Sequence, residues 1–235
     1  MKNTIAVATV ALLMFIVELY QSGRHWAQVT GWWYRAALLN GIQVASVFGA
    51  GVLWDRVMEG RGMWNLSGIA TSIQVIVGYI TVTFIYYWLH RVRHGIPFLW
   101  RWFHQVHHSP QRIEIITSFY KHPIEIIGNG ILSSAILYLL CGVMPEAASI
   151  TVLITGLAEL FYHWNVKTPL LDRLPPQRPE SHCVHHHRQK FADLPFWDIL
   201  FGTFHNPKKW ENVCGFEDDR ERGLGPMLVG KNVTE

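Results

Sequence analysis

Five apolar runs, separated by short polar segments, occupy the first two thirds of the chain. They cover residues 4–20, 36–54, 67–89, 126–144 and 147–164. The second and third runs contain no charged side chain. At about 1.5 Å per residue, each is long enough to cross a hydrocarbon core of roughly 30 Å as a helix. The pattern therefore predicts an all-α, integral-membrane bundle of four or five hydrophobic segments, and we expect five crossings with four as the alternative.

The last two runs predict a hairpin, and the first run raises the question of a signal peptide. The last two are separated only by Pro145-Glu146, which predicts a helical hairpin that enters the membrane and returns. The first run follows Lys2, as in a signal peptide, but no small-residue cleavage site comes after it. We therefore expect residues 1–21 to be a retained anchor or first span rather than a cleaved signal.

The distribution of basic residues predicts the orientation of the bundle. In a five-span arrangement, 17 of the 20 Lys and Arg residues fall on one side, in the 21–35 loop, the 90–125 segment and the tail after 164. The other side holds only Lys2, Arg56 and Arg61. Because positive charge is retained on the cytoplasmic side, we expect a cytoplasmic carboxyl terminus and an amino terminus on the opposite side.

Composition indicates a single membrane-embedded domain over residues 1–235. Half of the residues are hydrophobic, and the tail has too little apolar sequence for a core of its own, so it should cap the spans. A net charge of +3 without aromatic residues interleaved among the basic ones argues against a nucleic-acid partner. The three cysteines are widely spaced, so Cys183 is interpreted as a bystander rather than a metal ligand.

Histidines supply the candidate chemistry. Twelve of the thirteen lie between residues 90 and 205, and eight of them form one H-x-x-x-H and two H-x-x-H-H patterns. Residues three and four apart share a face of a helix, so each pattern can present its imidazoles together. The eight residues are His90, His94, His104, His107, His108, His182, His185 and His186.

Each cluster taken alone could be a hydrogen-bonded group at the membrane interface. The five-span arrangement places all three at one face, however, and that convergence predicts a metal centre. His163, at the end of the last run, reaches the same face and is a ninth candidate. For His122 three roles remain open: a metal ligand, a residue that supports a ligand, and the start of a helix. His187 is interpreted as a spare neighbour of the third cluster, and His25 and His205 as ordinary surface residues.

The number of imidazoles predicts two metal ions. A catalytic zinc usually takes three protein ligands and a water, so eight to ten histidines exceed what one zinc needs. Neutral imidazole binds iron, zinc, copper and nickel alike, and the ligand type therefore leaves the identity of the metal open.

The three patterns, in this order and beside apolar runs, resemble the fatty acid hydroxylase and sterol desaturase superfamily of integral-membrane, non-haem di-iron enzymes. The resemblance covers roughly residues 75–205. It extends to the segments around the clusters, which are Tyr87-Trp88-Leu89-His90-Arg91, residues 99–109, His122-Pro123-Ile124-Glu125, His163-Trp164-Asn165 and residues 196–204.

The resemblance implies a bundle of membrane helices with a cytosolic, histidine-rich helical cap. Two irons in the cap, replaceable by zinc, would use O2 as co-substrate to hydroxylate or desaturate a fatty acyl lipid, a sterol or a related lipid. The eight clustered histidines would be ligands, with His163 as an additional one. Asn165 could orient a ligand ring or hold a water at the metal, and Glu159 could hydrogen-bond a ligand imidazole or serve only between helices.

The resemblance also implies partners. The sequence has no haem-binding His-Pro-Gly-Gly segment, so we expect electrons from a separate ferredoxin, cytochrome or reductase. The basic tail, including Lys208 and Lys209, could dock that donor or contact anionic lipid. For Trp88, Trp100 and Trp102 we favour anchoring at the interface over lining a lipid entry.

Two other functions fit the sequence less well. A divalent-metal transporter or binding protein would need polar ligands near the middle of its spans, and the runs at 36–54 and 67–89 have no acidic residue or histidine there. A membrane zinc hydrolase is disfavoured because H-E-x-x-H is absent.

Overall fold

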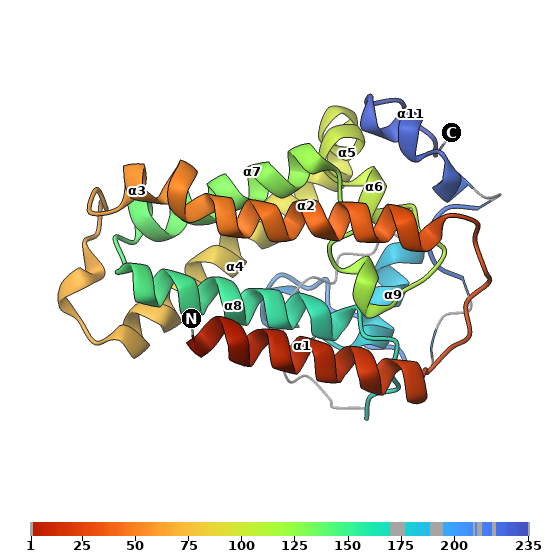
Figure 1. The fold of residues 1–235 in the computed structure, drawn as a ribbon, viewed down its shortest axis with the longest axis horizontal. Helices are drawn as coiled ribbons and strands as arrows, with labels where there is room; N and C mark the ends of the chain where they lie inside the picture. The colour runs from red at the N-terminus through yellow and green to blue at the C-terminus, as the bar shows by residue number, and fades with distance from the viewer. Residues whose placement is uncertain are drawn as a thin grey trace.

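Five long helices, each built on one of the apolar runs, lie along the longest axis of the molecule (Figure 1). The computed structural model describes residues 2–169, 177–188, 195–208, 210, 213–217 and 220–234. The long helices are α1 (Lys2–Tyr20), α2 (Trp32–Leu53), α4 (Thr71–Gly95), α7 (Pro123–Ser134), which continues as the π-helix η3 (Ala135–Leu140), and α8 (Pro145–Tyr162). No strand occurs in the described part of the chain. The all-helical fold is thus confirmed.

Most of the shorter helices gather at the two ends of the bundle. At one end lie α3 (Asp55–Met58) and η1 (Leu66–Gly68). The other short elements are α5 (Pro97–Phe103), α6 (Gln105–His108), η2 (Ile115–Thr117), α9 (Pro179–Arg188), α10 (Pro195–Leu200), η4 (Arg220–Arg222) and α11 (Leu224–Leu228). Of these, α10 lies beside the middle of α4. Figure 1 shows α5, α6, α9 and α11 together at the end away from α3. All of the histidine clusters belong to this second end, which we call the cap.

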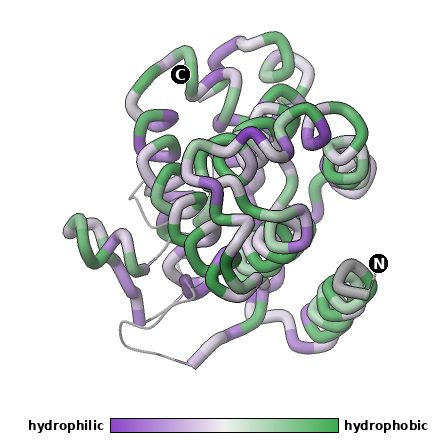
Figure 2. The backbone as a smooth tube through the Cα atoms, turned by 90° about the vertical axis from the view of Figure 1, so that its left-hand side faces the viewer, coloured by the Kyte–Doolittle hydropathy of each residue, from purple (hydrophilic) through white to green (hydrophobic). Residues whose placement is uncertain are grey.

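Three stretches are long and apolar enough to cross a membrane. They are Trp32–Met58, Thr71–Gly95 and Pro123–Leu140. The helix α8 has 18 residues but carries Glu146 and Glu159, and the apolar part of α1 covers Ile5–Tyr20. Large apolar side chains remain exposed along these helices. Figure 2 shows that the helix near the N label, α1, consists mainly of hydrophobic residues. Such surfaces are suited to lipid rather than water. The number of crossings stays a prediction.

Proline marks the start of several helices in this chain. Pro97, Pro123 and Pro145 each occupy the first turn of α5, α7 and α8. The proline nitrogen carries no hydrogen, and at this position a backbone N–H would have no partner within the helix, so proline costs nothing there. The break between α7–η3 and α8 lies at residues 141–144, and Pro145 and Glu146 form the first turn of α8, so the break precedes the two residues at which the sequence placed it. A hairpin that enters the membrane and returns stays a prediction.

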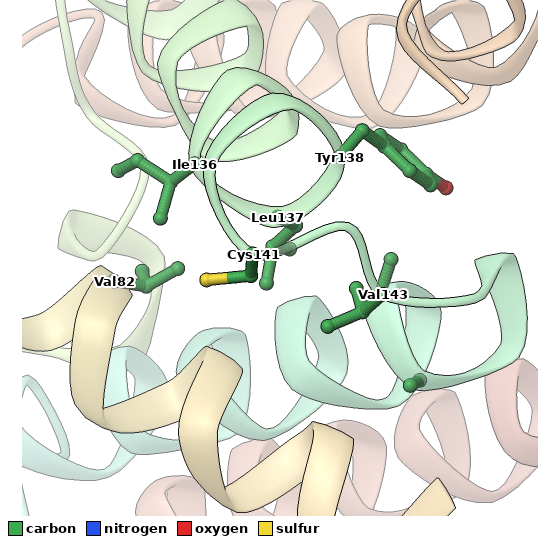
Figure 3. Packing of buried hydrophobic residues seen from close by; sticks show 8 residues of the cluster. Val82, Ile136, Leu137, Tyr138, Cys141 and Val143 are labelled. Carbon is green, nitrogen blue, oxygen red and sulfur yellow. The ribbon is translucent and has the colours of Figure 1, made fainter. Parts of the chain in front are cut away.

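A close-packed core joins α4, η3 and α8 (Figure 3). Val82 of α4 lies in the same buried cluster as Leu137 and Cys141 from the end of η3 and Ala148 of α8. Gly78 permits the approach, because a Cβ there would lie 2.9 Å from Cδ2 of Leu137. This core fixes α4, the helix that carries the first histidine pair, against the helix that ends at His163.

The helix α1 is integrated into the bundle at its cap end. It packs against α8, where the Trp164 indole N–H donates to the Met14 carbonyl at 2.8 Å. The buried carboxylate of Glu18 accepts main-chain N–H bonds from Ile115 at 2.9 Å and from Asn165 at 2.7 Å. These bonds tie α1 to the segment that follows His108 and to the segment that follows His163. The retention of residues 1–21 stays a prediction.

The described part of the tail covers the cap, as its composition suggests. Leu224 and Met227 of α11 are buried in one cluster with Trp32 and Leu39 of α2. The side-chain amide of Gln105 donates to the Lys231 carbonyl at 2.8 Å, which fastens the tail to α6. Lys208 is exposed, and Lys209 lies outside the described residues.

We expect Gly142→Ala to destabilise the end of the bundle opposite the cap. Gly142 has φ +61°, and a Cβ there would lie 2.8 Å from the backbone of Asn65. The strain should lower the free energy of unfolding by on the order of 2 kcal/mol, measured by denaturation in detergent. Gly41→Ala in α2 is the control, because nothing lies within 4 Å of its Cβ position. Equal stability of the two variants would contradict this packing.

Candidate metal centre

Nine histidines converge in two groups at the cap, and all of them except the half-buried His90 and His94 are buried. The first group takes its histidines from α4, from α6 and the residue before it, and from α9. The second group takes its histidines from α6, from the end of α8 and from α9. In each group the candidate ligand atoms lie within 4.8 Å of one another. The first group is His90, His94, His104, His108 and His185, and the second is His107, His163, His182 and His186.

The nitrogens of the first group point at a common centre. Nε2 of His90 lies 3.0 Å from Nε2 of His94, 2.9 Å from that of His185 and 3.2 Å from that of His104. Nε2 of His108 lies 3.0 Å from that of His104. A ring nitrogen carries either one hydrogen or one lone pair, so it cannot satisfy three neighbours by hydrogen bonding. The arrangement is that of lone pairs directed at one cation.

The second group repeats this arrangement with four rings. Nε2 of His182 lies 3.0 Å from Nε2 of His163 and 3.0 Å from that of His186. The ring of His107 completes the group, with its centroid 4.7 Å from that of His186 and 5.0 Å from that of His163. All four side chains are buried. Two metal positions are therefore available side by side.

The nitrogen spacing favours a coordination number above four in the first group. Two bonds of about 2.1 Å at right angles separate their ligand atoms by about 3.0 Å, whereas tetrahedral bonds would separate them by about 3.4 Å. The observed separations in the first group are 2.9 to 3.2 Å. Five donors at this spacing fit a five- or six-coordinate ion better than a tetrahedral zinc.

Each H-x-x-H-H pattern supplies both groups. In α6 and the residue before it, His104 and His108 enter the first group and His107 enters the second. In α9 the division is reversed: His182 and His186 enter the second group, and His185 enters the first. Adjacent residues on a helix point about 100° apart, so one helix can serve two centres. The rings of His108 and His186 stack at 4.4 Å, which places the two groups in contact.

Burial keeps the imidazoles in the form that binds metal. Desolvation is the largest cause that lowers the pKa of His104, His107 and His108 well below 6.5, and neighbouring rings lower it further. The same causes lower the pKa of His182 and His186. These five rings are therefore neutral at physiological pH, and neutral imidazole is the ligating form.

The family model for fatty acid hydroxylases matches residues 75–203, which is more than half of the chain. The chain belongs to the fatty acid hydroxylase family. It is thereby a member of the fatty acid hydroxylase and sterol desaturase superfamily. All nine converging histidines lie inside the matched region, which begins in α4 and ends just after α10. Searches of curated proteins and of solved structures found no match.

In this fatty acid hydroxylase family member, a buried carboxylate orients one of the converging rings. Oε1 of Glu125 lies 3.3 Å from Nδ1 of His104 and accepts a bond from Arg93 at 3.1 Å. The other terminal nitrogen of Arg93 donates to the Asn129 side chain at 2.6 Å. Carboxylates that accept from a ligand imidazole fix its orientation and raise its basicity.

Sequence reasoning did not single out Glu125 or Arg93 for this role. The available signal was a charged residue at the border of an apolar run: Glu125 directly precedes the 126–144 run, and Arg93 stands between the first two histidines. A charge in such a position is costly unless it is paired, and here each residue pairs with the other.

The possible supporting residues that the sequence suggested behave differently from one another. His163 is held through Nδ1 by the main-chain carbonyl of Glu159 at 2.9 Å, while the Glu159 carboxylate pairs with Lys121. His122 starts α7: its Nδ1 accepts from the Ile124 N–H at 3.0 Å, and its Nε2 faces the Leu228 carbonyl at 3.3 Å. The helix-start alternative therefore describes His122, because both of its nitrogens are engaged.

Asn165 is engaged with α1 and the segment after it. Its side-chain amide donates to the Arg24 carbonyl at 2.8 Å, and its buried Oδ1 has no hydrogen-bond partner among the described residues. His25 is exposed and His187 is half-buried, and neither joins a histidine group. Cys183 lies in an apolar cluster with Ile113, which agrees with its interpretation as a bystander.

The tryptophans near the clusters divide between two environments. Trp100 is buried, with its ring 5.2 Å from that of His94 and 5.3 Å from that of His108. Trp100 therefore packs against the first histidine group, and it does not anchor the protein at the membrane interface. Trp102 packs near His122, with ring centroids 5.6 Å apart, and Trp88 is exposed on α4.

Replacing Glu125 by Gln should weaken metal binding by about 10- to 100-fold, because His104 loses its charged acceptor. The affinity can be measured by chelator competition with Fe²⁺ or Co²⁺ in detergent. Glu159→Gln is the matched control, because His163 is held by the main-chain carbonyl of that residue and not by its carboxylate. Equal affinities of the two variants would contradict an orienting role for Glu125.

The metal-free protein should lose stability as the pH falls below about 6.5. Burial lowers the pKa of His104, His107, His108, His182 and His186 below the value of 6.5 that applies in the unfolded chain. The unfolded chain then binds more protons, so each histidine costs up to about 1.4 kcal/mol of stability per pH unit below 6.5. Denaturation of the metal-free protein between pH 7 and pH 5 measures this, and a flat profile would argue against neutral buried rings.

Proposed function

We propose that the chain is an O2-dependent lipid hydroxylase or desaturase that uses two irons held by the nine converging histidines. The observation that carries this proposal is the pair of adjoining histidine groups, five rings in one and four in the other. Two metal positions in contact are what a di-iron oxygenase needs. The membership of the fatty acid hydroxylase family supplies the reaction class.

Iron is preferred over zinc for a physical reason. Zinc in proteins is almost always tetrahedral, whereas the first group offers five nitrogens spaced for nearly right-angled bonds. Zinc nevertheless binds imidazole tightly and could replace iron in overproduced protein. Occupancy by zinc after purification would therefore describe the preparation rather than the reaction.

The residues around the centre have separable tasks in this function. The histidines bind the two ions, Glu125 and the Glu159 carbonyl orient two of the rings, and Trp100 excludes water from one side of the first group. Bound there, the two irons would supply the oxidising power that cleaves an unactivated C–H bond with O2. The protein supplies position and a dry surrounding.

The location of the centre suits a lipid substrate. The histidines lie at the cap end of apolar helices, so an acyl chain or a sterol could approach from the bilayer without crossing water. By the positive-inside rule this end faces the cytoplasm, where a separate ferredoxin, cytochrome or reductase would deliver electrons. Fatty acyl lipids, sterols and related lipids all fit this description.

A metal transporter is the alternative, and the position of the histidines argues against it. All nine lie together at one end of the bundle rather than along a path through it. An ion pathway requires polar ligands near the membrane midplane. A fixed centre explains the arrangement better.

The first test is the metal content of protein produced with added iron, with Mössbauer spectra of an iron-57 sample. We expect near two irons per chain in nitrogen-rich, coupled sites, and O2 consumption with a reductant and membrane lipid extract. One tightly held zinc, no iron uptake and no O2 consumption would contradict the proposal.

The two groups can be tested separately by substitution. His94→Ala in the first group and His107→Ala in the second should each lower the iron content from near two toward one and abolish lipid oxidation. His205→Ala, outside both groups, should leave both quantities unchanged. Retention of two irons by His107→Ala would overturn the ligand assignment.

A further inference from the structure

The short helix α10 turns its apolar side chains outward. Phe196, Ile199 and Leu200 are 59 %, 44 % and 60 % exposed. The polar groups of the helix face inward, since Asp198 is 1 % exposed and the Trp197 indole is 9 % exposed. For a helix in contact with water the opposite distribution would be expected.

This helix lies beside the middle of α4. The indole N–H of Trp197 donates to Oγ1 of Thr83 at 3.1 Å. Thr83 is midway between Thr71 and Gly95, the ends of α4. It precedes His90 by seven residues, which corresponds to about 10 Å along the helix axis. If α4 crosses the membrane, α10 lies level with the interior of the span and not with the cap.

Aromatic contacts make α10 continuous with the outer face of α4. The Phe84 ring lies 5.0 Å from that of Trp197, and the Trp88 ring lies 4.9 Å from that of Phe201. Phe84 and Trp88 are themselves exposed, and they continue the exposed positions Ile76 and Ile80 at four-residue spacing. The exposed side chains of α10 extend this apolar stripe.

Several polar groups of the turn after α10 are paired within the protein. The Asp198 carbonyl accepts from the N–H groups of Thr203 at 2.8 Å and of Phe204 at 3.1 Å. Its carboxylate accepts from the Thr203 hydroxyl at 2.6 Å, and that hydroxyl lies 3.0 Å from the Tyr87 hydroxyl. Gly202 makes the turn possible with φ +74°. Non-helical backbone is tolerated at membrane depth only when its polar groups are paired in this way.

We propose that residues 195–204 re-enter the membrane from the cap end, with the outer face of α10 in contact with lipid acyl chains. The partner of this surface is the hydrocarbon layer, because the surface is continuous with the face of a membrane-spanning helix. Only six residues separate α10 from Arg188, the last residue of α9, which carries three of the converging histidines. A re-entrant α10 thus holds the third histidine cluster close to the membrane.

The test places a fluorescent label on α10 in lipid bilayers. Phe196→Cys and Leu200→Cys are each labelled with an NBD maleimide and reconstituted in phosphatidylcholine vesicles. The native cysteines are buried, so the unsubstituted protein reports background labelling. Ile80→Cys on the exposed face of α4 is the lipid-facing control, and Lys231→Cys in the exposed tail is the water-facing control.

We expect both α10 labels to behave like the Ile80→Cys label, with fluorescence quenched by doxyl-labelled lipids and insensitive to aqueous iodide. Quenching by iodide without quenching by doxyl lipid would show a water-facing helix and overturn the proposal. Protection from both quenchers would show a protein-covered surface, such as a second copy of the chain, and would overturn it as well. Metal content is not part of this readout, so the proposal stands or falls separately from the oxygenase function.

Discussion

The convergence of nine imidazoles on two adjoining points is the constraint on which the rest of this structure depends. Imidazole nitrogens 3 Å apart cannot all be satisfied by one another, so the cap is organised around positive ions that the rings would share. Burial removes the competing proton by lowering the pKa of the rings. The rings that form the centre come from α4, α6 and α9 and from the end of α8, and Trp100 of α5 packs beside the first group.

The helices are held around this centre by polar anchors placed at the cap ends of the bundle. Glu125 joins α7 to Arg93 of α4 and to His104. Glu18 joins α1 to the segment that follows His108 and to the segment that follows His163, through the N–H groups of Ile115 and Asn165. Buried carboxyl groups are expensive without partners; here Glu125 pairs with Arg93, and Glu18 accepts two main-chain hydrogen bonds. Apolar packing alone would leave the helices free to slide, whereas these bonds fix their register where the ligand geometry is decided.

A membrane-spanning helix needs an apolar outer face, whereas the histidine centre needs polar ligands, and α4 supplies both. Its middle packs through Gly78 and Val82 into the core that also contains η3 and α8. Its last two turns present His90 and His94 to the first histidine group. Its outer face carries the apolar stripe that α10 extends. One helix therefore connects the lipid phase to the site at which a lipid would be oxidised.

The sequence by itself determined the helical class, the position of the long helices and the set of nine converging histidines. Hydrophobic runs and the spacing of i, i+3 and i+4 are local properties, and local geometry translates them directly into helices and shared faces. Only the tertiary structure decided which histidines belong together, because the division of α6 and α9 between two groups depends on how those helices are rotated against α4 and α8. It also decided that His122 starts a helix, that Glu159 acts through its carbonyl and that Glu125 supports His104. Those roles rest on contacts between residues distant in the chain, which no local pattern encodes.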